Sequence, residues 1–109
     1  GERFATVASA YLENAGDWPM SKLISILLDA TAEFGDRDDA AMALSESDEP
    51  DAAEALLRVA LDDGSDADLA DRAGESLSAI WRRNNVARPD LVSQMHPAAR
   101  RFFDPPLER

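Results

Sequence analysis

The sequence predicts an all-α fold in a single domain, and three observations support this prediction. Ala and Leu are the commonest of the hydrophobic residues, which make up 45% of the 109 positions, and both favour helices. Aromatic residues, which favour strands, make up only 6%. Apolar positions recur at spacings of three and four residues, and Gly, Pro and acidic residues interrupt them at intervals typical of short helices.

Charge and cysteine content exclude several classes of function. The 22 acidic and 11 basic residues give a formal net charge of −11, which repels nucleic acids and anionic lipids and attracts cationic partners. Because the chain has no Cys, disulfides, thiolate catalysis and cysteine-ligated metals are excluded. The longest apolar run, within residues 23–28, is far shorter than the ~20 residues of a membrane span. The N-terminus also lacks the basic-then-apolar order of a signal peptide, so we expect a cytoplasmic protein.

Two helices are predicted in the first third of the chain. Apolar residues at helical spacing indicate an N-terminal helix over residues 1–15, and Gly1 in place of Met suggests that a preceding segment is missing. Asp17 and Pro19 mark the start of a second helix over residues 20–34, which we expect Gly35 to end. The residues predicted to line its buried face are Leu23, Ile24, Leu27, Leu28, Thr31 and Phe34.

Five further helices are predicted downstream. Acidic residues in its first turn indicate a short helix over residues 36–47. Pro50 starts the next helix, which runs toward Gly64, and Asp66 or its neighbours start a long one that ends near residue 83. Two short helices follow within residues 88–104. We therefore expect one domain over residues 1–109, with the N-terminal helix, a first repeat at 17–47, a second at 50–83 and the C-terminal helices.

An internal repeat is the most informative feature of the sequence. "KLISILLD", residues 22–29, aligns with "ALLRVALD", residues 55–62, at an offset of 33 positions. The turn acids Asp29 and Asp62 match as well as the apolar positions. Further matches at the same offset pair Asp38 with Asp71, Ala40 with Ala73 and Leu44 with Leu77. The two halves therefore resemble one helix pair written twice.

The segment "DRAGESLSAIW", residues 71–81, resembles the second helix of HEAT-like repeats. The resemblance covers residues 18–83 and implies antiparallel helix pairs in a short right-handed α-solenoid of about five to seven helices. It also implies that Ala73 and Gly74 are small because the two helices of a pair cross closely there. An ordinary helical bundle, in which the helices align at this offset by chance, is the alternative.

Neither a metal site nor a catalytic site is predicted. "DDGSDAD", residues 62–68, superficially resembles a calcium loop, but Gly64 stands at its third position and Ala73 at its twelfth, where oxygen ligands are required. Helix capping and turn formation explain these acids without a metal. His96 is the single histidine, and no nucleophile motif accompanies it. We expect no enzyme activity and no cofactor.

A candidate partner-binding surface follows from aligning the two exposed helix faces. Asp68, Asp71 and Glu75 lie at helical spacing, and the repeat places Asp38, Met42 and Glu46 on the corresponding face. If the helices stack side by side, the predicted surface comprises Asp36, Asp38, Asp39, Met42, Glu46, Asp63, Asp66, Asp68, Asp71 and Glu75. It is either a solvated face or a docking site for a basic protein, and docking is favoured because we expect no basic patch to balance it.

A second resemblance gives this surface a biological role. "LADRAGESLSAIWRR", residues 69–83, is similar to small bacterial HEAT-like proteins found beside polymorphic or contact-dependent toxins. The resemblance implies an immunity protein that neutralises a cationic toxin domain, possibly a nuclease, by covering its active or substrate-binding face. The alternative is a scaffold or adaptor module in a larger assembly. The identity of the partner and the oligomeric state stay open.

Overall fold

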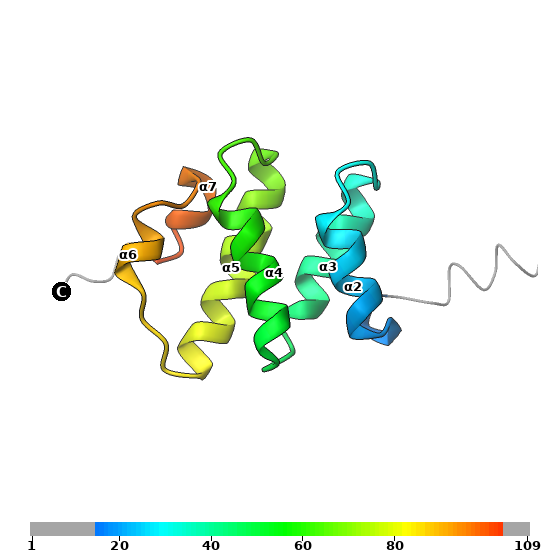
Figure 1. The fold of residues 1–109 in the computed structure, drawn as a ribbon, viewed down its shortest axis with the longest axis horizontal. Helices are drawn as coiled ribbons and strands as arrows, with labels where there is room; N and C mark the ends of the chain where they lie inside the picture. Colours follow the sequence, from blue (N-terminus) through cyan, green and yellow to red (C-terminus); the bar gives the residue numbers. More distant parts are fainter. Residues whose placement is uncertain (1–14, 104–109) are drawn as a thin grey trace, which may run out of the picture.

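The computed structural model describes residues 15–103, and the helix predicted over residues 1–15 lies outside this range but for its last residue. A 3₁₀ turn, η1 (Ala15–Asp17), precedes the α-helices (Figure 1). These are α2 (Met20–Leu28), α3 (Phe34–Leu44), α4 (Pro50–Leu61), α5 (Ala67–Arg83), α6 (Pro89–Val92) and α7 (Pro97–Arg100). Residues 15–103 contain no strand, so the all-α prediction is confirmed for this part of the chain.

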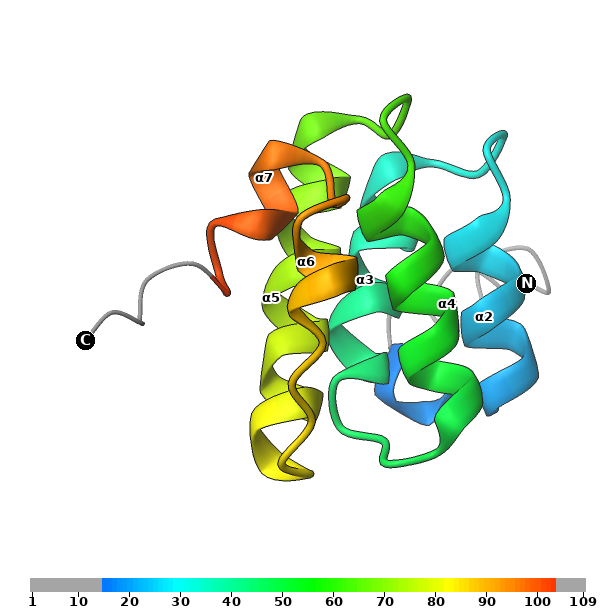
Figure 2. The same ribbon diagram turned by 60° about the vertical axis from the view of Figure 1, so that its left-hand side comes forward.

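The four longer helices form two pairs that lie side by side. Helix α2 packs on α3 and α4 packs on α5, and both short turns lie at the same end of the molecule (Figure 1). Across the pairs, α2 contacts α4 and α3 contacts α5. Figure 2 shows the resulting two layers, one of α2 and α4 and the other of α3 and α5. The first helix of each pair therefore occupies one layer and the second helix the other.

The predicted helix over residues 20–34 is two elements in the structure. Helix α2 ends at Leu28 because the Asp29 carboxylate accepts hydrogen bonds from the Thr31 amide, 2.8 Å away, and from its hydroxyl at 2.6 Å. The expected buried face is correspondingly wrong at its end, since Leu28 is 37% exposed and Phe34 47% exposed. Gly35 does not end a helix but lies in the first turn of α3.

The same turn recurs 33 residues later, at the offset that the internal alignment predicts. Helix α4 ends at Leu61, and Asp62 takes the backbone angles of Asp29, φ −86° with ψ 109° against φ −86° with ψ 106°. The Asp62 carboxylate accepts from the Gly64 amide at 2.8 Å. Helix α3 starts at residue 34 and α5 at residue 67. The two acids matched in sequence therefore perform the same local task.

The core lies between the two layers and is built from leucines and alanines. Leu27, Leu44, Leu56, Leu69 and Leu77 are its largest fully buried side chains. Alanines without solvent exposure fill the closer contacts, and they include Ala40, Ala41, Ala52, Ala60, Ala70 and Ala73. Small side chains allow the helices to approach closely, which compensates for the few aromatic residues of the chain. The pairs thus bury their faces against each other as well as within themselves.

Helix α7 packs on α5, and the two backbones approach closely at Gly74. A Cβ on Gly74 would lie 2.5 Å from Cα of Ala99 in α7, so the resemblance assigned the wrong neighbour to this glycine. Ser78 is buried on α5, although its spacing predicts an outward position. The amide of His96 donates to the carbonyl of Ala60 at 2.8 Å, and His96 Nδ1 caps α7 by accepting from the Ala98 amide. The C-terminal segment therefore bridges α4 and α5.

The two tryptophans have different environments. Trp81 is 8% exposed, and its ring lies 5.4 Å from the ring of Phe103, so it seals the core beneath the C-terminal helices. Trp18 is half-buried, and the ammonium of Lys22 lies 4.6 Å from its ring centroid.

Candidate protein-binding surface

The ten predicted surface residues lie on one layer and its two connecting segments. Asp36, Asp38, Asp39 and Met42 are on α3, and Glu46 follows it. Asp63 is in the turn before α5, Asp66 is the N-cap of α5, and the remaining three lie on α5 itself. The α3 and α5 groups are neighbours, because these helices pack side by side.

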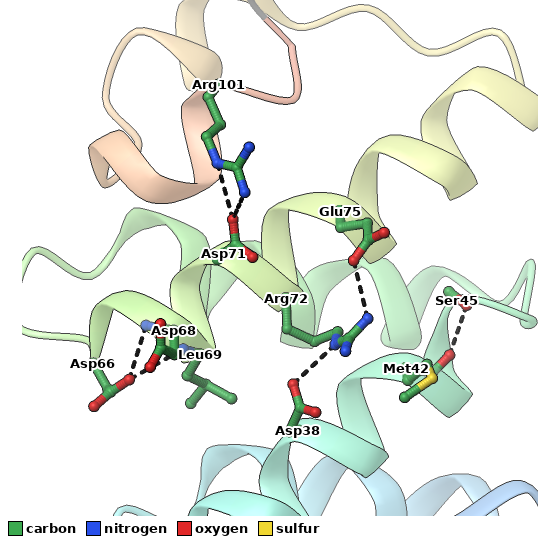
Figure 3. Close-up of polar contacts among 10 residues, drawn as sticks. All are labelled: Asp38, Met42, Ser45, Asp66, Asp68, Leu69, Asp71, Arg72, Glu75 and Arg101. Atoms are coloured by element: carbon green, nitrogen blue, oxygen red, sulfur yellow. Dashed lines mark hydrogen bonds and ion pairs between the residues drawn. The ribbon is translucent and has the colours of Figure 1, made fainter.

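Arg72 joins the two helices at the centre of this surface. Its Nε lies 2.8 Å from Oδ1 of Asp38 on α3, and its Nη1 lies 3.0 Å from Oε1 of Glu75 on α5 (Figure 3). The hydrogen bond to Asp38, followed by the charges of its acidic neighbours, raises the pKa of the Arg72 guanidinium above its ordinary value. Arg72 therefore holds the two predicted faces together and neutralises part of their negative charge.

Asp71 is also paired, with a residue from the C-terminal segment. The Arg101 guanidinium contacts its carboxylate through two nitrogens, with Nε 2.9 Å from Oδ1 (Figure 3). The guanidinium of Arg101 also stacks on Phe102, 4.4 Å from the ring centroid. Asp71 thus fastens the segment after α7 to α5, a role that its position in the sequence repeat does not indicate.

Asp66 is occupied by the backbone of α5. Its Oδ1 accepts from the amides of Asp68 at 2.9 Å and Leu69 at 3.3 Å, which makes it a helix N-cap, as its place before the apolar run predicts (Figure 3). Among residues 15–103, no three His, Cys, Asp or Glu side chains form a group able to hold a metal ion. The acids of this stretch therefore cap and turn the chain.

The acids that remain available to a partner are a subset of the prediction. Asp36, Asp39, Glu46, Asp63 and Asp68 are exposed and make no ion pair within residues 15–103. Met42 is 44% exposed on the same helix as two of these acids. Such a surface offers carboxylates to basic side chains and one flexible apolar side chain to a partner's apolar contact.

The charges of the molecule are separated along the chain. Residues 15–75 hold 17 acidic residues against four Lys or Arg, a net charge of −13. Residues 76–103 hold five Arg against the single acid Asp90, a net charge of +4 with His neutral. The expectation that no basic patch balances the acidic surface is therefore wrong, because these arginines gather in the C-terminal part.

Three of these arginines lie around a hollow that was not predicted from the sequence. The end of α5, the segment after it, α6 and the residues around the end of α7 surround an open hollow of about 960 Å³. Arg82, Arg88 and Arg100 line it together with Trp81 and Phe103. The one sign of this hollow in the sequence is that several arginines stand among apolar residues after position 80. Helical periodicity does not show that these arginines come together, because they belong to separate elements.

No family model, curated protein or solved structure matches this chain in comparisons with known proteins. No α-helix among residues 15–103 has the length and apolar character needed to cross a bilayer.

Proposed function

We propose that this protein is a binding module whose acidic α3–α5 layer docks on a cationic protein. The charge separation supports the proposal most directly, since a net charge of −13 over residues 15–75 attracts a basic surface over a long range. The exposed acids without ion pairs supply short-range contacts. Asp68 on α5 represents the layer in the variant experiment below.

The proposed partner is a toxin domain, possibly a nuclease, and the proposed role is that of an immunity protein. The resemblance of residues 69–83 to small bacterial HEAT-like proteins supports this role. Carboxylates of the layer would pair with the Arg and Lys that a nuclease needs for phosphate binding, and the module would block substrate access. Inhibition then follows from occlusion and requires no catalytic group on this chain.

We also propose that the two helix pairs are units of a short right-handed α-solenoid of the HEAT-like kind. The recurrence of the Asp29 turn at Asp62, and the placement of first and second helices in separate layers, support this architecture. In such an architecture the second helices form a continuous surface, which is the layer proposed to dock.

The binding experiment uses proteins encoded next to this chain's gene, purified and immobilised one at a time. We expect one of them, a cationic protein, to bind with nanomolar affinity that weakens steadily as NaCl rises from about 50 to 500 mM. Its enzymatic activity should fall in proportion to occupancy. Binding that leaves the partner's activity intact would indicate a scaffold instead of an immunity protein.

A matched pair of variants locates the docking layer. Asp68 and Asp51 are each the second residue of a helix, each exposed and each without an ion pair within residues 15–103, but Asp68 is on α5 and Asp51 on α4. Asp68→Lys should weaken binding by about tenfold or more, whereas Asp51→Lys, with the same change in net charge, should weaken it much less. Equal losses would show that net charge, and not the α3–α5 layer, attracts the partner.

A further inference from the structure

The hollow beside the end of α5 has the properties of a ligand pocket. Its volume, about 960 Å³, lies within the range of pockets that hold small molecules. Trp81 and Phe103 form an aromatic pair in its wall, with rings tilted by 59°. Val86 and Val92 add aliphatic surface, and Val86 is 41% exposed. Apolar side chains left in contact with water at a concave site favour an apolar occupant.

The charged lining residues of the hollow are all arginines. Arg82 donates from Nη2 to the carbonyl of Phe102 at 3.4 Å, a long contact that leaves most of its donors available. Arg88 pairs with Asp90, 2.8 Å away, and this hydrogen bond raises the pKa of Arg88. Arg100 makes no ion pair within residues 15–103, although it is exposed on a protein with many acids. An anionic group placed over the apolar wall would satisfy the available donors of Arg82 and Arg100.

The rest of the molecule restricts which anion can enter. A polyanion such as a nucleic acid would extend beyond the hollow and meet the net charge of −13 carried by residues 15–75. A single carboxylate attached to an apolar body meets only the three arginines and the aromatic wall. Size and charge together therefore select a small amphipathic monoanion.

We propose that this pocket binds an organic carboxylate with an aliphatic or aromatic body of about ten carbons. The apolar body lies against Trp81, Phe103 and Val86, and the carboxylate accepts hydrogen bonds from Arg100 and Arg82, because Arg88 already donates from Nε and Nη2 to both carboxylate oxygens of Asp90. Guanidinium groups suit this role because they bind carboxylates through two parallel hydrogen bonds. The proposal does not depend on the cationic protein partner proposed above, because the two sites have opposite charge and share no residue.

Decanoate, below its micellar concentration, is the probe, and Trp81 is the reporter. A Trp18→Phe background leaves Trp81 as the single tryptophan, so that a change in fluorescence reports on the hollow itself. We expect a saturable change with an apparent Kd below about 1 mM. Decanol, which has the same chain without the charge, should bind at least about tenfold more weakly. Equal binding of decanol, or no saturable change with decanoate, would overturn the proposal.

Three substitutions in this background distinguish a specific site from general adsorption. Arg100→Gln should raise the Kd for decanoate by about tenfold or more, because it removes a charged donor. Arg58→Gln is the matched control, since Arg58 is an exposed helix arginine outside the hollow, and its effect should be under twofold. Val86→Asp places a carboxylate at the exposed edge and should abolish binding while circular dichroism stays unchanged. If Arg58→Gln and Arg100→Gln weaken binding equally, the pocket is not the site.

Discussion

Gly74 lies where α7 approaches α5 most closely, and its missing side chain allows that contact. Gly74→Ala would bring a Cβ within 2.6 Å of two backbone atoms of Ala99, and backbone atoms cannot move away without displacing α7. We expect the free energy of unfolding to fall by about 1–3 kcal/mol, as in other overpacked sites. Urea unfolding followed by circular dichroism measures this change.

Gly35 provides the control for that substitution. It is also helical, in the first turn of α3, but an added Cβ would meet nothing within 4 Å. Gly35→Ala should therefore stabilise the protein, by up to about 1 kcal/mol, because Ala has the higher helix propensity. If both glycine variants changed stability in the same direction, close packing of α7 would not be the reason for Gly74.

Asp48 joins the link before α4 to the end of α5. Its carboxylate accepts from the Asn84 amide nitrogen at 3.0 Å and from Arg83 Nε at 2.8 Å, and these contacts lower the pKa of the Asp48 carboxyl. A lowered pKa in the folded state contributes stability above the unfolded value, about 3.9, and loses it as pH falls through the folded value.

The expected pH dependence is therefore a difference between two proteins. Wild type should melt at a higher temperature than Asp48→Asn near pH 6, and the difference should shrink as pH falls below about 3.9, the unfolded value, toward zero below the folded one. Asp63→Asn, at an exposed acid without an ion pair within residues 15–103, controls for the general loss of negative charge. A difference between wild type and Asp48→Asn that persisted to the lowest pH would rule out the ionised carboxylate as its source.

Single residues differ in how far the sequence predicts them. Asp66 could be assigned as a cap because capping depends on neighbours within three positions. The pairs of Arg72 with Asp38 and of Arg101 with Asp71 could not, because each joins positions that only tertiary packing brings together. Asp38 and Asp71 were therefore predicted to face a partner, whereas in the structure they form ion pairs within the molecule.

At the scale of elements, the two turns that end α2 and α4 can be compared directly, because each contains an aspartate at the same position. The carboxylates of Asp29 and Asp62 each accept a hydrogen bond, at 2.8 Å, from the amide two residues later in the chain. Hydrogen bonds from the Thr31 hydroxyl and amide lower the pKa of Asp29. Asp29→Ala and Asp62→Ala should each lower the melting temperature by a few degrees. Asp→Asn at either position keeps an acceptor oxygen and should retain most of the stability.

Similar losses at the two turns are expected because their backbone angles agree. Differential scanning calorimetry of the single and double variants measures whether the losses add, as they should for two separate turns. An Asn variant as unstable as its Ala counterpart would show that the side-chain hydrogen bond does not hold the turn.

Element boundaries were predictable where a start signal and periodicity agreed. Pro50 and Asp66 placed the starts of α4 and α5, and the acids after them marked first turns. The break between α2 and α3 was missed because Leu28 and Phe34 continue the apolar spacing, while the turn depends on an Asp–Thr hydrogen bond. Apolar spacing alone does not reveal that Leu28, unlike the buried leucines of the same helix, is exposed.

For the whole molecule, the separation of charge predicts how stability responds to salt. Repulsion among the acids of residues 15–75 opposes folding and is screened by ions, whereas the exposed ion pairs each contribute little. We expect the melting temperature to rise as NaCl increases from about 10 to 500 mM at pH 7. NaCl and KCl should act alike, and a falling melting temperature would mean that ion pairs outweigh the repulsion.

The fold class and the acidic character were predictable because composition and periodicity are summed over many residues. The hollow was not predictable, because α5, the segment after it, α6 and α7 form it only after α7 docks on Gly74. In the sequence, nothing connects the three arginines at positions 82, 88 and 100. Their placement around an aromatic wall is a property of the tertiary structure alone.

The short lengths of α6 and α7 affect the motion of the molecule. Each has four residues, whereas isolated helices need about 12–15 residues to be stable in water. They are held by tertiary contacts such as the His96 amide to Ala60 and Arg101 to Asp71. Amide protons of residues 89–103 should therefore exchange with solvent through a local opening that leaves the core leucines protected. The hollow would open and close together with residues 89–103. A molecule bound in the hollow should therefore slow the exchange of the amide protons of these residues.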